Sequence, residues 1–395
     1  MSIPDDLLPD TTGPLHMTPS PLVPFYDDAA LIRADRAAID AALGRVLDAG
    51  SPDWGPEGPA FEADLAGWCG AAHAVAVASG TQALVLALRA LGIGPGHVVA
   101  TVANTDSPTP SAIRQVGARP VFVDIEPKTR CMDPEALAAC LASPVGTEVR
   151  AVLTVDMHGH PADADRIRPL ARERGIPMIS DACISLGAED RGRKVGTLAD
   201  VTCVSFGGSK LLPTVGTGGA CLTDDPATGR RMRMLAGYGQ DRMNRAPADW
   251  RYELDAMNVR MGELQAAILR TRLPRLDGWL SCRRAQARQY AEGLAGLPLD
   301  LPEARAGTLP AWRNYTIGCD DPMGLAEALL ARGIVTRRLY APPMHHEPGY
   351  STIARASDLA RTEAAARRLL CLPIGPHLTT AQIAQVVTAL SQILS

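Results

Sequence analysis

The sequence has 395 residues, 46% of them hydrophobic, which is enough to bury the core of a large α/β domain and a smaller second one. Its formal net charge is only −4 and it has no long basic block, which argues against nucleic acid or a membrane surface as a partner. The nine cysteines are scattered and none forms a CxxC pair, a pattern typical of reduced cytosolic thiols rather than disulfides. No apolar run approaches the roughly 18 residues of a membrane span, and the acidic N-terminus does not resemble a secretory signal. We therefore expect a cytoplasmic protein.

The first part of the chain predicts a short arm followed by alternating strands and helices. Residues 1–22 are rich in Pro, Asp and Thr and are predicted to form a loose arm. Helical periodicity begins near Ala30 and continues to Val46, where a Pro/Gly-rich stretch follows. Buried strands are predicted at residues 74–78, 98–102, 120–124, 149–155, 177–181 and 201–206, and helices at residues 82–91, 134–141 and 164–174.

The pattern changes after Asp255. Two long helices are predicted at residues 262–272 and 276–294, and the second is expected to lead into a smaller domain. That domain is predicted to hold a strand at 315–319 and helices at 322–332 and 380–394. The predicted organisation is therefore an arm (1–22), a large α/β domain (23–265) and a small C-terminal α+β domain with the connecting helix (266–395).

The strands of the large domain are almost continuously apolar and alternate with helices. This pattern predicts a mostly parallel central sheet covered by helices on both faces. Ligands of such sheets bind at the carboxyl ends of the strands. Gly80, Asp181 and the segment 205–210 all lie at or just past a predicted strand end, so they are expected to converge.

Lys210 stands between an apolar strand and a glycine-rich loop in a chain with few lysines. A partly desolvated lysine can lose its proton and form an imine with a carbonyl compound, which arginine cannot do. Ser79-Gly80-Thr81 leads from a strand into a helix, an arrangement that suits a phosphate group. Taken singly, Lys210 could be a solvated loop residue, the Gly80 turn could be empty, and Asp181 could cap a helix.

Together these residues point to one cofactor. Pyridoxal phosphate needs a lysine for its aldehyde, a carboxylate to keep its ring nitrogen protonated and a cup for its phosphate. Lys210, Asp181 and Gly80 supply the three groups, and the hydroxyl of Ser205 could add a phosphate contact. The His158-x-His160 pair would need a third ligand to hold a metal ion, so no metal site is predicted.

Longer motifs resemble one known family across nearly the whole chain from about residue 22. The chain is similar to the DegT/DnrJ/EryC1/StrS sugar aminotransferases, which depend on pyridoxal phosphate and have the fold-type-I architecture. The motifs that carry the resemblance are Ser79-Gly80-Thr81-Gln82-Ala83-Leu84, Gly117-Ala118-Arg119-Pro120-Val121-Phe122-Val123-Asp124, Asp181-Ala182-Cys183-Ile184-Ser185-Leu186-Gly187-Ala188 and Met257-Asn258-Val259-Arg260-Met261-Gly262-Glu263-Leu264-Gln265-Ala266-Ala267.

The resemblance implies roles for individual residues. Lys210 would bind the cofactor aldehyde, Asp181 the pyridine nitrogen, and a further set the phosphate: Gly80, Thr81 and Ser205. Asn258 would reach the phosphate from the partner subunit, which implies a homodimer with shared active sites. The substrate contacts implied by the resemblance are Arg260, Tyr340 and His345.

Two positions depart from the family pattern near the cofactor. Ile184 stands where the family usually has Gln, sometimes Glu, close to the cofactor's phenolic oxygen. Asp106 stands where an aromatic residue commonly stacks on the ring. Either Asp106 turns away to cap a helix and another side chain covers the ring, or the enzyme has an altered reaction or a cationic substrate.

The expected reaction transfers an amino group from an amino acid, Glu or Gln, to a keto group of a nucleotide-activated sugar, in antibiotic or polysaccharide biosynthesis. A keto-cyclitol substrate is the close alternative. A variant pyridoxal phosphate enzyme, or a silent partner subunit of the same family, is a further alternative that Ile184 and Asp106 support.

Overall fold

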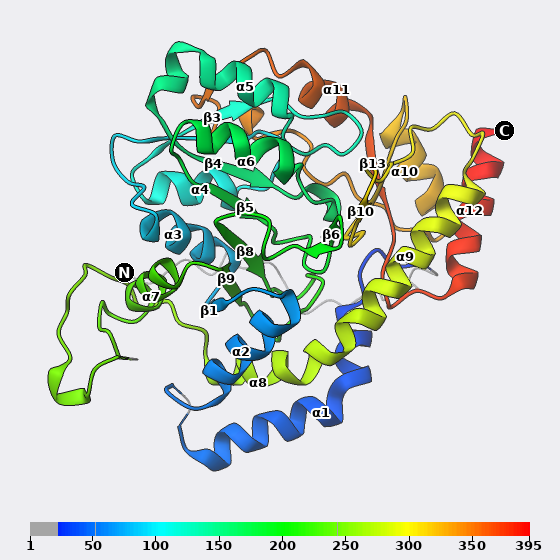
Figure 1. Cartoon of the computed structure of the whole chain (residues 1–395). Helices are drawn as coiled ribbons and strands as arrows, with labels where there is room; N and C mark the ends of the chain where they lie inside the picture. The colour runs from blue at the N-terminus through cyan, green and yellow to red at the C-terminus, as the bar shows by residue number, and fades with distance from the viewer. Residues whose placement is uncertain (1–22, 52, 243) are drawn as a thin grey trace, which may run out of the picture.

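The computed structural model describes residues 23–51, 53–242 and 244–395, so the predicted arm at 1–22 lies outside the described residues. An eight-stranded sheet forms the centre (Figure 1). In spatial order its strands are β1 (His73–Val77), β9 (Gly219–Thr223), β8 (Val201–Ser205), β5 (Met178–Asp181), β4 (Val149–Val155), β2 (Val98–Val102), β3 (Arg119–Val123) and β12 (Ala354–Arg355).

Seven of these strands run in one direction, and β9 alone is antiparallel to its neighbours β1 and β8. The predicted mostly parallel α/β architecture is therefore confirmed, but β9 was missed because its start reads as a glycine-rich loop. Gly219 begins β9 directly against the turn after β1. A Cβ atom built on Gly219 would lie 2.4 Å from the carbonyl oxygen of Ser79, so only glycine allows this approach.

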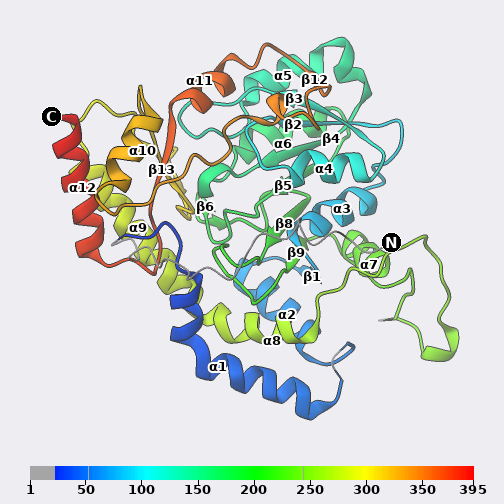
Figure 2. The ribbon, with the colours of Figure 1, turned by 180° about the vertical axis from the view of Figure 1, so that it is seen from behind.

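The helices lie around this sheet (Figure 1). α1, α2 and α8 stack beside its β1 end, and both views place α10 and α12 at the opposite side of the molecule from α7 (Figures 1 and 2). The described helices are α1 (Asp28–Ala49), α2 (Glu57–Cys69), α3 (Gly80–Ala90), α4 (Pro108–Gln115), α5 (Pro134–Ala142), α6 (Ala164–Glu173), α7 (Pro226–Ala236), α8 (Glu263–Arg272), α9 (Leu276–Gly293), α10 (Pro322–Leu330), α11 (Ala360–Arg368) and α12 (Thr380–Leu394). None of them is long and apolar enough to cross a membrane.

Helix α9 connects two separate hydrophobic cores. Its first turns place Leu276 and Leu280 in the large core around the sheet, and its later turns place Ala287 and Tyr290 in the smaller one. The small core is built with α10, α12 and the antiparallel pair β11 (Tyr315–Gly318) and β13 (Leu369–Leu372). The boundary at residue 265 stays a prediction, and the change of core occurs along the predicted connecting helix. A third, small sheet comprises β10 (Thr308–Leu309), β6 (Glu189–Asp190) and β7 (Arg193–Lys194).

A buried ion pair fixes α1 and α8 to the segment that follows Lys210. Arg272 Nε lies 2.9 Å from Asp35 Oδ2, and both side chains are almost fully buried. Arg272 Nη1 also donates to the carbonyl oxygen of Pro213 at 2.6 Å. Arg275 forms a second ion pair with the same carboxylate. Because charges taken out of water need partners, this network should be sensitive to the loss of one member.

We expect Asp35→Ala to destabilise the protein by about 3–5 kcal/mol, because it leaves Arg272 as an uncompensated buried charge. The shift of the urea unfolding midpoint measures this effect. Asp40→Ala is the matched control on the same helix, since Asp40 forms an exposed pair with Arg36 and should cost less than about 1 kcal/mol. Equal midpoints for the two variants would contradict the assigned role of Asp35.

Candidate active site

A cavity of about 170 Å³ opens at the carboxyl ends of the parallel strands β1, β5 and β8. It gathers eight of the residues predicted for the site from five separate parts of the chain: Gly80, Thr81, Asp106, Asp181, Ile184, Ser205, Lys210 and Tyr340. This convergence follows from the topology, because parallel strands bring their carboxyl ends to one edge of the sheet.

The N-terminus of α3 forms one wall of the cavity. Ser79 caps the helix by accepting a hydrogen bond from the Gln82 amide at 3.2 Å. Gly80 lies so close to β8 that an added Cβ atom would meet Ser205 Cβ at 2.7 Å and Cys183 Sγ at 2.9 Å. The absence of a side chain at Gly80 keeps the helix amides open to the cavity beside the Ser205 hydroxyl. This is a cradle suited to a phosphate group.

Asp181 ends β5 and is buried, with only 6% of its surface exposed. Its Oδ2 accepts a hydrogen bond from the hydroxyl of Thr109 at 2.8 Å, and its Oδ1 accepts one from the Cys183 amide at 3.2 Å. Thr109 is itself 2.7 Å from the hydroxyl of Thr105. Because both carboxylate oxygens are engaged, the carboxylate is held in one orientation at the cavity wall.

A second carboxylate, Asp156, follows the neighbouring strand β4. Its Oδ1 accepts from the Ala162 amide at 3.0 Å and its Oδ2 from the Ser185 hydroxyl at 2.7 Å. Burial, with the charge of Asp181 as a smaller cause, raises the pKa of Asp156 to about 6. Asp156 and Asp181 are thus neighbouring buried carboxyl groups, and of the two Asp181 lines the cavity.

Lys210 supplies an amine and Cys183 a thiol to the described lining of the cavity. Lys210 is half-buried, and its backbone amide donates to Gly207 at 2.9 Å in the loop after β8. Burial raises the pKa of the Cys183 thiol well above its usual value, and the Asp181 charge adds to this effect while Lys210 opposes it. A raised pKa disfavours the thiolate, which is the reactive form of cysteine.

Asp106 and Tyr340 also line the cavity. Asp106 is exposed, and its Oδ1 accepts a hydrogen bond from the Ser107 amide at 2.8 Å, just before α4. Tyr340 has a φ of 64°, a left-handed backbone conformation that non-glycine residues rarely adopt. Ile184 is buried in the same wall and presents an apolar side chain.

Three predicted residues do not line this cavity in the described chain: Asn258, Arg260 and His345. Asn258 is exposed, and its side-chain oxygen accepts from Arg260 Nη2 at 3.3 Å. The Arg260 guanidinium stacks 3.3 Å from the ring centroid of Trp54 and lines a separate cavity of about 520 Å³.

The histidines singled out in the sequence have partners of their own. His345 is buried, and its Nε2 lies 2.7 Å from Glu363 Oε1. His158 contacts the ring of Tyr340, with centroids 5.5 Å apart, whereas His160 contacts Trp312 at 5.0 Å. The two rings of the His-x-His motif thus face different neighbours.

Thr105 and Thr109 are cavity residues that the sequence reasoning missed. Each is almost fully buried and lines the cavity, Thr105 in the loop after β2 and Thr109 in the first turn of α4. Thr105 precedes the helix, so helical spacing does not predict that its hydroxyl meets that of Thr109. Pro108 and Pro110 also hide the start of α4 from a reading of the sequence.

Comparison with known proteins identifies the family of this chain. The profile of the DegT/DnrJ/EryC1/StrS aminotransferase family matches residues 33–391. The dTDP-3-amino-3,4,6-trideoxy-alpha-D-glucose transaminase of Streptomyces venezuelae is 40% identical over 94% of this chain and 96% of its own. The L-glutamine:2-deoxy-scyllo-inosose aminotransferase of Streptoalloteichus tenebrarius is 37% identical over 78% of each chain.

Solved structures extend the match to the whole fold. DesV of S. venezuelae superimposes with a TM-score of 0.89 at 40% identity, covering 94% of this chain and 98% of its own. NtdA of Bacillus subtilis, solved with bound cofactor PMP, reaches 0.84 at 28% identity, covering 94% of this chain and 85% of its own. The chain therefore belongs to the DegT/DnrJ/EryC1/StrS aminotransferase family and is a pyridoxal-phosphate-dependent aminotransferase.

Proposed function

We propose that this aminotransferase moves an amino group from an amino acid, Glu or Gln, to the keto group of a nucleotide-activated sugar in antibiotic or polysaccharide biosynthesis. The observation that carries the proposal is the convergence of Lys210, Asp181 and the Gly80 cradle on one cavity. The sugar class is supported by the 40% identity to the S. venezuelae transaminase along almost the whole chain. A keto-cyclitol is the competing acceptor, because the S. tenebrarius relative is named for one.

The residues present fit pyridoxal phosphate. The α3 amides after Ser79, with Thr81 and Ser205, would hold its phosphate, because Gly80 leaves the helix end open. Asp181, fixed by Thr109, would hold a proton on the ring nitrogen. When bound, the cofactor supplies an electron sink for the reacting carbon.

Lys210 would perform two tasks in the reaction. Its amine would hold the cofactor aldehyde, and after release by the incoming amino group it would move a proton at the reacting carbon. The half-buried position lowers the competition from water, and the raised pKa of Cys183 disfavours a competing thiolate. Of the three residues expected to contact the substrate, Tyr340 lines the cavity that holds Lys210, and we propose that it contacts the substrate there.

Lys210→Ala should abolish transamination and the visible absorption of the lysine-bound cofactor, because no other amine lines the cavity within the described residues. Absorption spectra before and after glutamate addition measure both effects. Lys194→Ala is the control, since that lysine contacts the Trp68 carbonyl away from the cavity and should leave both unchanged. A Lys210→Ala protein with the unaltered spectrum would reject the assignment.

Thr109→Val should lower kcat by roughly ten- to hundredfold, because it removes a hydrogen bond to the charged Asp181 while keeping the side chain's shape. Cofactor binding should persist, and KM should change less than kcat. Thr109→Ser restores the hydroxyl and should recover most of the rate. If Thr109→Ser were as slow as Thr109→Val, the hydroxyl would not be what positions Asp181.

Asn258 is proposed to act in the partner's active site, which is consistent with its exposure and its position outside the cavity of its own chain. In a homodimer with shared sites, mixing Lys210→Ala and Asn258→Ala subunits creates one intact site in each mixed dimer. We expect random mixing to recover about a quarter of the wild-type activity. Mixing Lys210→Ala with Asp181→Ala should recover nothing, because both residues line the same cavity of one chain. Equal recovery in the two mixtures, or none in either, would contradict the shared site.

The acceptor can be identified by single turnover. Enzyme carrying the amino group on its cofactor is mixed with nucleotide-activated keto sugars or with keto-cyclitols, and the return of the cofactor spectrum is timed. The proposal predicts faster return with a keto-sugar nucleotide. Faster return with a keto-cyclitol would establish the alternative acceptor.

A further inference from the structure

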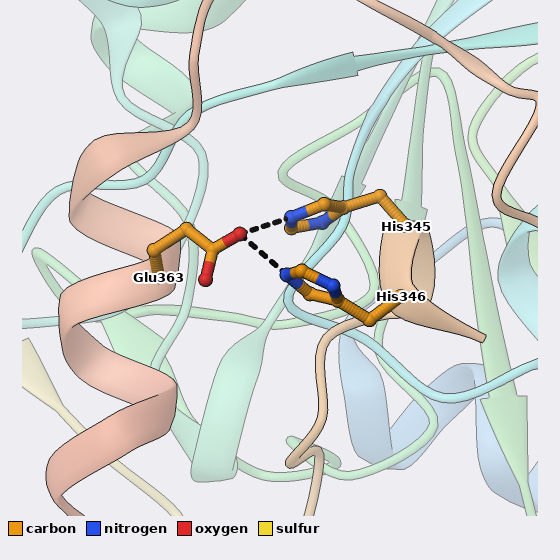
Figure 3. Close-up of side chains that lie close together, drawn as sticks. All are labelled: His345, His346 and Glu363. Atoms are coloured by element: carbon orange, nitrogen blue, oxygen red, sulfur yellow. Dashed lines mark hydrogen bonds and ion pairs between the residues drawn. The ribbon is translucent and has the colours of Figure 1, made fainter.

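A cluster of three metal-ligand side chains lies outside the cavity that holds Lys210. His345 and His346 belong to the short 3-10 helix η6 (Met344–His346), and Glu363 lies in the first turn of α11. The Nε2 atoms of both histidines point at the same oxygen, Glu363 Oε1, at 2.7 and 2.5 Å (Figure 3). One ligand atom from each residue falls within 4.8 Å of the other two.

We propose that His345, His346 and Glu363 form a binding site for a divalent transition-metal cation, with Zn²⁺ the best fit. Two imidazole nitrogens and one carboxylate oxygen are a ligand set that suits Zn²⁺ and leaves a fourth position for water. This metal site is separate from the aminotransferase site, and the proposal does not depend on which substrate the enzyme uses.

The burial of the three side chains suits an ion that enters from solvent. His345 is fully buried and forms a fixed floor, whereas His346 is half-exposed and Glu363 one-quarter exposed. The outer two ligands therefore leave a path for the ion and room for its water. A site closed on all sides would have no such path.

The contact distances require only a small rearrangement. The present spacings are hydrogen-bond lengths, whereas ligands of a tetrahedral Zn²⁺ at about 2.0–2.2 Å from the ion stand roughly 3.3–3.5 Å apart. Glu363 Oε1 must therefore withdraw by less than about 1 Å from both nitrogens, which its one-quarter exposed side chain permits. The two histidine nitrogens, which lie within 4.8 Å of each other, must settle at the same spacing. The ion would then replace the two hydrogen bonds that now join η6 to α11.

Neighbouring groups set the expected affinity. Arg367 lies 3.8 Å from the other oxygen of Glu363, and its positive charge opposes a cation. His345 Nδ1 is buried without a hydrogen-bond partner among the described residues, so the ring lacks the outer-shell support that strengthens metal sites. Affinity on the order of micromolar is therefore expected rather than the tighter binding of a structural zinc site.

The site lies on the segment that leads out of the active cavity. Tyr340 lines that cavity, and four residues later the amide of Met344 donates to Ala103 in the loop after β2 at 2.9 Å. An ion that joins η6 to α11 would hold this segment against the helix. Metal addition should accordingly raise the midpoint of thermal unfolding.

Isothermal titration of tag-free, chelator-treated holoenzyme with Zn²⁺ tests the proposal. We expect one Zn²⁺ per chain, with affinity weakened more than about tenfold by His346→Ala and by Glu363→Gln. His97→Ala is the control, because His97 contacts Gly94 before β2 and should not alter binding. Co²⁺ in place of Zn²⁺ should give the visible absorption of a tetrahedral site in wild type and control only.

Retained cofactor absorption shows that each variant is folded, since neither His346 nor Glu363 lines the active cavity. Wild-type affinity in the His346→Ala and Glu363→Gln variants would overturn the proposal, because the ion would then bind elsewhere, for example at cysteine. No Zn²⁺ binding by the wild type at millimolar concentration would overturn it as well, leaving the three residues as a hydrogen-bonded clamp.

Discussion

The close approach of the β1–α3 turn to strands β8 and β9 is the constraint on which the site depends. Gly80 meets Ser205 and Cys183 at distances that no side chain would permit, and Gly219 passes the Ser79 carbonyl in the same way. The antiparallel strand β9, placed between β1 and β8, draws these segments together. Because the phosphate cradle and the loop carrying Lys210 both begin there, one tight contact fixes their spacing.

Much of this arrangement could be predicted from the sequence, because buried parallel strands have nearly continuous apolar sequences. Their carboxyl ends located Gly80, Asp181, Ser205 and Lys210, and all four line one cavity. Strand β9 could not be recognised, since its Gly219 serves a long-range contact with Ser79 rather than a local turn. Local patterns carry no information about such contacts.

Side-chain partners were harder to predict than positions. The hydrogen bond from Thr109 to Asp181 joins residues 72 apart, and the one from His345 Nε2 to the Glu363 carboxylate spans 18 residues and two elements. The sequence motif suggested a substrate contact for His345 and gave no hint of a shared acceptor with His346. Periodicity reports which face of an element is buried, but it does not report what that face meets.

The two departures from the family pattern affect the cavity differently. Asp106 is exposed, so water screens the charge of its carboxylate. The same carboxylate accepts a hydrogen bond from the Ser107 amide just before α4. Ile184 is buried and adds apolar surface to the wall. The Asp106 carbonyl oxygen accepts from the Thr109 amide at 3.3 Å, and the Thr109 hydroxyl keeps its hydrogen bond to Asp181. Tyr340 supplies an aromatic ring to the same described lining. The departures therefore alter the surface of the cavity, while Asp181 and Lys210 both stay in its lining.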